Sequence, residues 1–272
     1  MTSRREQSLT LVILGVFSLI ALLPIVGILV TAVQDPNGLG SFGSFDGIHL
    51  GNFADAWTQG HFGSYLRSST IVAVTVVVVA SAFSLLAGYA FGLMRFRGAE
   101  VLFYVLLLGL MVPTEAIIVP LYYDLRDLKL TDTYWALILP QIGTSVAFGT
   151  FWMRAFFRTV PRSLIEAARL DGASTWFILW RVLLPLARPA VLTMVVLLFM
   201  WTWNEFLLAL VMVSEEGLRT APLGLSFFQG RNTSNLTLLA AGAVIVATPV
   251  VVLYVFLQRH FIRGMLAGAV KG

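Results

Sequence analysis

The sequence predicts an all-α integral membrane protein with six transmembrane helices and a cytoplasmic helix–turn–helix between the fourth and the fifth. Of its 272 residues, 58% are apolar and 12% are charged, whereas charged residues make up about 25% of an average globular chain. Several charge-free runs reach the ~20 residues that a helix needs to cross the hydrocarbon core of a bilayer. This composition excludes a soluble enzyme and a disordered chain. The lack of cysteine excludes disulfides and Cys-ligated metal centres.

The first two spans follow from two long apolar runs. Residues 9–33 carry no charge and follow Arg4 and Arg5. The run is too long for a signal peptide and no Ala-x-Ala cleavage site follows it, so we interpret it as an uncleaved span. After a polar, glycine-rich segment, the second span covers residues 65–94. Its valine-rich run resembles a strand, but a segment in lipid must pair its own backbone groups, which favours a helix.

Four further apolar runs complete the set of spans. The third span, residues 101–123, is interrupted by Pro113, Glu115 and Pro120, so we expect a kinked or partly broken helix there. The fourth, fifth and sixth spans are expected at residues 133–157, 189–213 and 235–258. The whole chain, residues 1–272, is expected to form one transmembrane domain.

Basic residues are unevenly distributed between the loops on the two sides of these spans. The side of the N-terminus collects 13 of the 18 lysine and arginine residues. The positive-inside rule therefore places both termini and the loop at residues 158–188 in the cytoplasm. A nucleic-acid binder would instead carry its basic residues as a patch on a soluble face, so no nucleic-acid partner is expected.

Catalytic and cofactor-binding motifs are missing from the sequence. It contains no Gly-x-x-x-x-Gly-Lys-Ser/Thr loop for nucleotide phosphates, and His49, His61 and His260 are too far apart to suggest a metal site. No Ser/His/Asp or paired-carboxylate arrangement stands out. We therefore expect neither an enzyme nor a cofactor or metal bound by this chain.

The loop at residues 158–188 predicts a helical hairpin that projects from the membrane. Ser163 and Glu166 fit a capping box at the start of a short helix over residues 164–171. Gly172 supplies the left-handed residue that ends this helix.

A second short helix follows in the same loop. Ser174 can cap it at its start, and Pro185 is expected to stop it after Leu184. On this local evidence alone, the hairpin could equally be an inert structure that lies on the lipid headgroups.

The residues of this hairpin resemble a known signature. The EAA signature of bacterial ABC importer permeases consists of Glu-Ala-Ala, three free positions, Gly, nine free positions, Ile, one free position and Leu-Pro. The matching residues are Glu166, Ala167, Ala168, Gly172, Leu184 and Pro185, with Val182 in place of Ile. Val keeps the β-branched shape of Ile, so the loop resembles the coupling loop of these permeases at every fixed position but one.

Other segments extend the resemblance over nearly the whole chain. Pro113, residues 120–122 and residues 130–134 resemble the segment that joins the middle spans of carbohydrate importer permeases. Residues 203–206 resemble the fifth-span motif of these proteins, and residues 264–272 resemble the tail of the smaller maltose-type permease subunit. The chain is thus similar to maltose-type permeases of the binding-protein-dependent carbohydrate importers.

This resemblance implies a subunit of a larger importer in the cytoplasmic (inner) membrane. Its partners would be a second permease subunit, two ATPase subunits that bind ATP and Mg²⁺, an extracytoplasmic sugar-binding protein and the lipid bilayer, and its substrate a sugar or oligosaccharide. The residues expected to couple the chain to an ATPase are Glu166, Ala167, Ala168, Asp171, Gly172, Leu184 and Pro185. Those expected to reach an ATPase from the C-terminal tail are Arg263, Gly268, Lys271 and Gly272.

The expected translocation path rests on acids inside the spans, because such acids are costly in lipid and are candidates for function. Trp201, Asn204 and Glu205 would share a helical face with Leu208. Aromatic planes beside amide and carboxylate groups suit the apolar faces and hydroxyl edges of a sugar. Glu115 is the other candidate acid. Glu205 could equally hold the fold by pairing with a neighbouring span, and in maltose-type importers the larger permease subunit is associated with the sugar contacts.

Three other functions fit parts of the same pattern. A permease for glycerol-phosphate or for an amino-sugar oligomer remains open, although an anionic substrate would favour basic residues in the cores of the spans, which lack them. A stand-alone secondary transporter or channel would show inverted repeats, and a membrane enzyme would cluster ionisable residues near one membrane face. Neither feature stands out here. We therefore expect a permease subunit that forms half of a translocation path and couples ATPase closure to alternating access.

Overall fold

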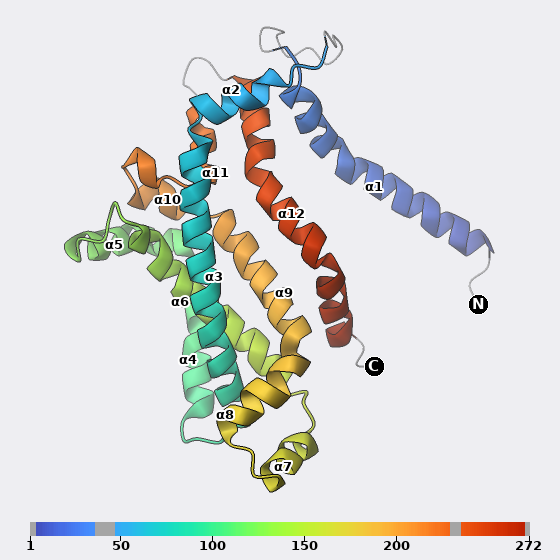
Figure 1. Cartoon of the computed structure of the whole chain (residues 1–272), viewed down its shortest axis with the longest axis vertical. Coiled ribbons are helices and arrows are strands. Elements are labelled where there is room, and N and C mark those ends of the chain that lie inside the picture. The colour runs from blue at the N-terminus through green and yellow to red at the C-terminus, as the bar shows by residue number, and fades with distance from the viewer. Residues whose placement is uncertain (1–3, 36–46, 229–234, 270–272) are drawn as a thin grey trace. The chain divides into compact units, whose positions relative to one another are not determined.

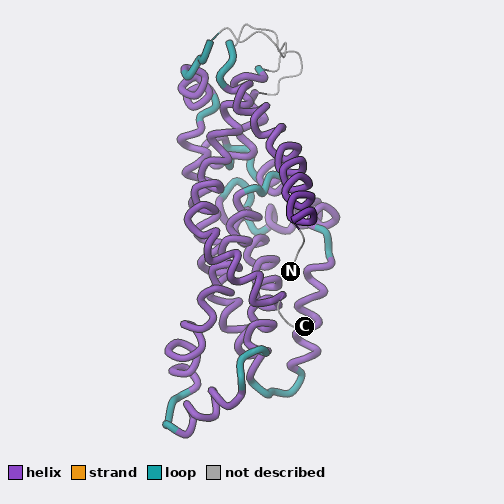
Figure 2. The backbone as a smooth tube through the Cα atoms, turned by 90° about the vertical axis from the view of Figure 1, so that its right-hand side faces the viewer, coloured by secondary structure: helices purple, strands orange, loops and turns teal. Residues whose placement is uncertain are grey.

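The computed structural model describes residues 4–35, 47–228 and 235–269, and every regular element within these ranges is a helix (Figures 1 and 2). Five of the described segments are long and apolar enough to cross a membrane. They are Glu6–Ala32 of α1 (Arg4–Ala32), α3 (Phe62–Leu93), α6 (Tyr134–Phe157), the run Thr175–Trp203 and Leu236–Gln258 of α12 (Leu236–Ala269). The all-α prediction is confirmed, and the predicted second and fourth spans agree with α3 and α6 to within three residues at each end.

The predicted third span is broken in the structure, as its prolines indicate. It consists of α4 (Ala99–Met111) and α5 (Thr114–Asp127), which meet at an angle of 96° and would count as a sixth span if taken together. Between them Val112 is extended and Pro113 caps α5. Proline offers no backbone N–H and disfavours a helical conformation in the residue before it, so the helix ends at this point.

The predicted fifth span, residues 189–213, was wrong in both of its boundaries. The helix runs without interruption from α8 (Thr175–Phe177) through the π-helix η1 (Ile178–Leu183) into α9 (Leu184–Trp203). Pro185 does not stop the second arm of the hairpin, because the π-helix η1 just before it accommodates the missing N–H and the helix continues as α9. The chain then breaks and resumes as the short helix α10 (Leu207–Met212).

The hairpin itself differs from the prediction at its start. The helix α7 (Arg162–Leu170) begins after Pro161 with no side-chain cap, so the expected capping box from Ser163 does not form. The predicted turn is confirmed, since Gly172 has a φ of +78°. Ser174 caps α8 as expected, with its Oγ accepting a hydrogen bond from the Phe177 N–H at 3.2 Å.

The described chain divides into two compact units. The first comprises residues 1–63 and 224–249, and it contains a helix that the sequence analysis missed, α2 (Gly51–Gln59). The buried Asn52 ties α2 to the end of α1, because its Nδ2 donates to Ala32 O at 3.0 Å and to Gln34 O at 2.8 Å. The Phe62 ring stacks on Phe228 at a centroid distance of 6.2 Å.

The second unit comprises residues 64–223 and 250–272. Its two long helices α3 and α6 pack closely through small residues. A Cβ added at Gly88 would overlap the Met153 side chain, and one at Gly92 would lie 2.9 Å from Phe157 Cβ. From the other side, a Cβ at Gly149 would overlap Ser84. Such small-residue stripes let helix backbones approach each other in a membrane, where apolar burial adds no driving force.

An alanine at Gly149 tests this contact. Overpacking of this kind costs about 1–3 kcal/mol in soluble proteins, so we expect Gly149→Ala to lower the melting temperature of the purified chain by several degrees. The matched control is Gly143→Ala, because Gly143 lies on the same helix and a Cβ there meets no atom within 4 Å. Equal melting temperatures for the two variants would contradict the close approach of α3 and α6.

Candidate functional site

The hairpin formed by α7, Gly172 and α8 is anchored on one side and open on the other. Ile165 is buried and belongs to an apolar cluster with Phe157, Ile178 and Leu183. This cluster fixes α7 against the ends of α6 and of the helix that continues into α9. The hairpin lies at one end of the second unit (Figure 1).

The open side of the hairpin carries the predicted coupling residues. Glu166, Ala167, Asp171 and Gly172 are exposed, and Ala168 is partly buried. Leu184 and Pro185 lie farther along, in the first turn of α9. The structure therefore gathers the Glu-Ala-Ala segment and the glycine on one accessible loop, and assigns the Leu-Pro pair to the span that follows.

Several exposed apolar side chains on the hairpin were not singled out from the sequence. Leu170 is 90% exposed and Trp176 is 63% exposed, with its ring in an edge-to-face contact with Trp180 at 5.3 Å. Large apolar side chains in a charged loop were the available signal. Large exposed apolar side chains in such a loop are typical of a surface that contacts another protein or a membrane.

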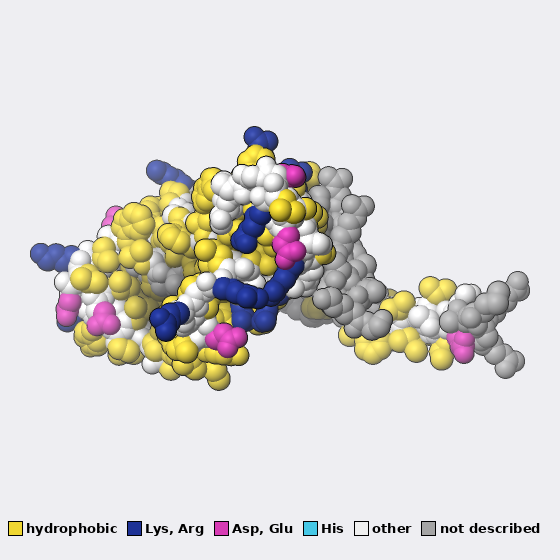
Figure 3. Space-filling model, turned by 90° about the horizontal axis from the view of Figure 1, so that it is seen from below, with side chains coloured by type: hydrophobic (Ala, Val, Ile, Leu, Met, Phe, Trp, Pro, Cys, Tyr) yellow, Lys and Arg dark blue, Asp and Glu magenta, His cyan; other side chains and the backbone are white. Residues whose placement is uncertain are grey.

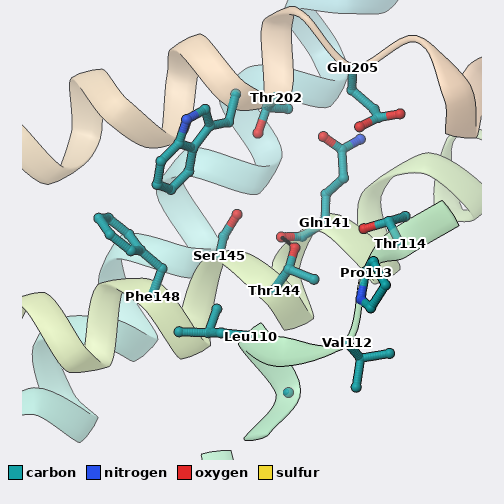
Figure 4. Close-up of a pocket in the computed structure, with 12 residues that line it drawn as sticks. Leu110, Val112, Pro113, Thr114, Gln141, Thr144, Ser145, Phe148, Thr202 and Glu205 are labelled. Carbon is teal, nitrogen blue, oxygen red and sulfur yellow. Dashed lines mark hydrogen bonds between the residues drawn. The ribbon is translucent and has the colours of Figure 1, made fainter. Parts of the chain in front are cut away.

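A second candidate site is a pocket of about 450 Å³ within the second unit, referred to below as the central pocket. It lies where the break between α4 and α5, the middle of α6 and the end of α9 face one another (Figure 4). Its lining residues are Gly109, Leu110, Val112, Pro113, Thr114, Gln141, Thr144, Ser145, Phe148, Trp201, Thr202 and Glu205. Those from α6 recur at three- and four-residue spacing, so they form one face of the helix.

Aromatic side chains line one end of the central pocket, and polar side chains line the other. Phe148 and Trp201 form an edge-to-face pair with ring centroids 4.6 Å apart. At the other end, the side chains of Gln141 and Glu205 point toward one another (Figure 4). Gln141 is fixed by a hydrogen bond from its Nε2 to Leu137 O at 2.8 Å. The pocket thus offers a flat apolar wall next to oriented hydrogen-bonding groups.

Glu205 also has a structural role. Its Oε1 accepts a hydrogen bond from the Leu208 N–H at 2.8 Å, so it caps the start of α10 after the break. A carboxylate at a helix N-terminus is favourable because that end carries free N–H groups and a partial positive charge. The acid that the sequence analysis assigned to a span therefore lies at a break between helices, where it satisfies backbone groups.

The other predicted path residues do not join the pocket. Asn204 is exposed and its Nδ2 donates to Met200 O at 2.7 Å, while Leu208 is buried in an apolar cluster. The predicted shared helical face was wrong because the helix ends at Trp203. Glu115 is exposed in the first turn of α5 and does not line the central pocket.

The segment at residues 130–134, just before α6, is hydrogen-bonded to the chain at the end of α10. Asp132 has a φ of +55°, and its Oδ1 accepts hydrogen bonds from the Ser214 N–H and, at 3.0 Å, from the Glu215 N–H. Its own N–H donates to Met212 O at 3.1 Å. This aspartate therefore clamps the end of α10 to the start of α6, which holds the wall of the central pocket in position.

The predicted tail contacts lie mostly outside what the structure describes. Arg263 and Gly268 belong to the helix α12, but their side chains are not described, and Lys271 and Gly272 lie outside the described residues. Their expected contact with an ATPase stays a prediction. Within residues 4–35, 47–228 and 235–269, no three His, Asp or Glu side chains come together as a set of metal ligands.

Comparison of the sequence with known proteins shows the family to which the chain belongs. Residues 80–267 match the family described as "Binding-protein-dependent transport system inner membrane component". The chain is 36% identical over 224 residues to the probable ABC transporter permease protein YurM of Bacillus subtilis. This match covers 82% of this chain and 74% of that protein. It is 33% identical over 244 residues to the arabinooligosaccharides transport system permease protein AraQ of Halalkalibacterium halodurans. This match covers 89% of this chain and 84% of that protein.

A solved structure agrees with the same assignment. A chain from the crystal structure of a bacterial ABC transporter involved in the import of the acidic polysaccharide alginate superposes with a TM-score of 0.82. The two sequences are 25% identical, and the match covers 96% of this chain and 99% of the other.

Proposed function

Since the chain belongs to the inner membrane components of binding-protein-dependent transport systems, we propose that it carries a neutral sugar or oligosaccharide along the central pocket. It is a permease subunit of an ABC importer rather than an enzyme. The observation that carries this proposal is the pocket lining. The paired rings of Phe148 and Trp201 match the apolar face of a sugar ring, and Gln141, Thr144 and Ser145 offer hydrogen bonds to hydroxyl groups. The name of the arabinooligosaccharide permease supports the same class of substrate.

The charge of the central pocket separates the candidate substrates. Glu205 is the one charged residue among the described side chains that line it. A phosphorylated or acidic sugar would meet a carboxylate with no basic group beside it, which disfavours glycerol-phosphate. An amino-sugar oligomer is the second candidate, because an ammonium group would be attracted to Glu205.

The proposed partners are those of a complete importer. We expect a second permease subunit, two ATPase subunits with ATP and Mg²⁺, and an extracytoplasmic sugar-binding protein. The hairpin would face the cytoplasm, with both chain termini on the same side. Its exposed apolar side chains, above all Leu170 and Trp176, are the surface that a cleft on the ATPase would cover.

The continuous helix from α8 to α9 offers a route for coupling. The second arm of the hairpin and the span that ends at the central pocket are one rod of 29 residues, Thr175–Trp203. A shift of the hairpin imposed by ATPase closure would move this rod and change the pocket at its far end. In thermodynamic terms, ATP and sugar would each bias the same two-state element.

Reconstitution tests the proposed function directly. The chain alone in liposomes should neither hydrolyse ATP nor accumulate sugar, because it has no nucleotide-binding loop. Addition of its permease, ATPase and binding-protein partners should produce ATP-dependent uptake. Sugar accumulation by the isolated chain would contradict the assignment to a partner-dependent importer.

A β-branched residue at Gly172 tests the coupling role of the hairpin. The left-handed backbone at φ +78° costs a valine about 1–2 kcal/mol, so we expect Gly172→Val to re-aim α7 and reduce uptake and substrate-stimulated ATP hydrolysis several-fold. Gly98→Val is the matched control, because Gly98 has a φ of +82°, is equally open, and lies outside the hairpin. Equal losses in both variants would assign the effect to backbone strain alone.

Charge removal at Glu205 tests the path. Glu205→Gln keeps an oxygen for the Leu208 N–H, so we expect the melting temperature of the assembled complex to stay close to that of the wild type while sugar uptake falls several-fold. Trp201→Ala should likewise reduce uptake by removing the aromatic wall. Glu115→Gln is the comparison, because Glu115 does not line the pocket. A fall in melting temperature that matches the fall in uptake would reassign Glu205 to the fold.

A further inference from the structure

A groove of about 860 Å³ borders the hairpin and is referred to below as the arginine groove. Its lining comes from the end of α3, the start of α4, the end of α6, one face of α7 and the start of α8. Five arginines line it, with two acids, Glu100 and Glu166. The arginines are Arg95, Arg154, Arg158, Arg162 and Arg169. The lining therefore has a formal charge of +3, five positive charges less two negative ones. Figure 3 shows the second unit from the end that carries the hairpin, where basic side chains gather beside acidic ones.

The arginines of the groove form no ion pair with a carboxylate in the described part of the chain. The one ion pair described elsewhere joins Arg126 and Asp127, and none of the five arginines lies within salt-bridge distance of a described carboxylate. Arg154 is instead fixed by the protein backbone and by an aromatic ring. Its Nε donates to Phe91 O at 3.2 Å, and its guanidinium lies 3.7 Å from the centroid of Phe103. Arg154 is thus held in place where it lines the groove.

The groove is also continuous with an apolar surface. Phe91, Leu93, Met94 and Phe96 form part of its lining. From its edge, α4 presents an exposed apolar side, with Val101 at 66%, Leu102 at 54%, Val105 at 59% and Leu108 at 59% exposure. A ligand with an anionic head and an apolar tail would satisfy both surfaces at once, with its head among the guanidinium groups and its tail along α4.

We propose that the arginine groove binds the phosphodiester headgroup of an anionic phospholipid from the cytoplasmic leaflet, with an acyl chain lying along α4. Arginine is suited to this role because its planar guanidinium donates two parallel hydrogen bonds to phosphate oxygens. Basic sites between helices at the cytoplasmic face select anionic over zwitterionic lipids. The leaflet assigned here rests on the proposed orientation of the hairpin. Because α7 forms one wall of the groove, a bound lipid would stabilise the hairpin in one position.

Lipid titration of the purified full chain, followed by native mass spectrometry, tests the proposal without reference to transport. Phosphatidylglycerol should bind at a single tight site, and phosphatidylcholine should bind much more weakly. Each arginine near a membrane surface contributes about fivefold to such binding, so Arg95→Gln with Arg158→Gln should weaken phosphatidylglycerol binding about 25-fold. The paired changes to Lys keep the charges and should retain most of the binding, which separates charge from misfolding.

A control and two further measurements define the outcomes that would overturn the proposal. Arg126→Gln with Lys129→Gln removes the same charge from residues that do not line the groove and should leave binding unchanged. Equal affinity for the two lipids, or wild-type affinity in the Arg95 and Arg158 variant, would rule out the groove as a lipid site. Displacement of phosphatidylglycerol by an equal concentration of glycerol 1-phosphate would show a site for free phosphate. If the ATPase subunits expel the lipid from the complete importer, an acidic protein surface occupies the groove instead.

Discussion

Every backbone N–H and C=O group inside a hydrocarbon layer must find a partner within the protein, and this constraint shapes the whole chain. It leaves the helix as the regular structure for the spans and allows irregular backbone only where that backbone is buried or lines a polar cavity. The second unit has two such breaks, one at Val112 and Pro113 and one after Trp203. Both border the central pocket. The pocket is therefore located where the helices stop, and Glu205, which caps the helix after one break, also lines the space between them.

Close packing of α3 on α6 supplies the rigid frame for this pocket. The residues that line the pocket from α6 and the small residue Gly149, which contacts Ser84 of α3, lie on the same helix. Gly149 lies one helical turn beyond Ser145 of the pocket lining, so the contact with α3 holds the part of α6 that borders the pocket. Asp132 closes the arrangement by joining the start of α6 to the end of α10. In the proposed mechanism, α6 would stay fixed against α3, and motion transmitted along α9 would change the pocket from one side.

Much of this fold could be predicted from the sequence, because membrane spans depend on local composition. Apolar runs predicted α3 and α6 closely, and Pro113 predicted the break between α4 and α5. The errors at the boundaries of the fifth span have one cause: hydropathy reports burial in lipid and not helical continuity. Pro185 predicted the end of a helix, but the helix continues through the π-turn before it. The break after Trp203 contains no proline that would have predicted it. Of the candidate path, Trp201 and Glu205 line the pocket, whereas Gln141 and Phe148 were missed because the polar and aromatic side chains of α6 carry no charge to single them out.

The π-helix at Ile178–Leu183 has a consequence for the direction in which the hairpin points. A π-turn holds one residue more than an α-helical turn, and each residue of an α-helix advances the chain by about 100° around its axis. The extra residue therefore sets the azimuth of α7 relative to the central pocket. Loss of one residue from this turn would keep the span and its hydrophobicity but rotate the hairpin by about a quarter of a circle. The length of this segment therefore sets the direction in which the hairpin points.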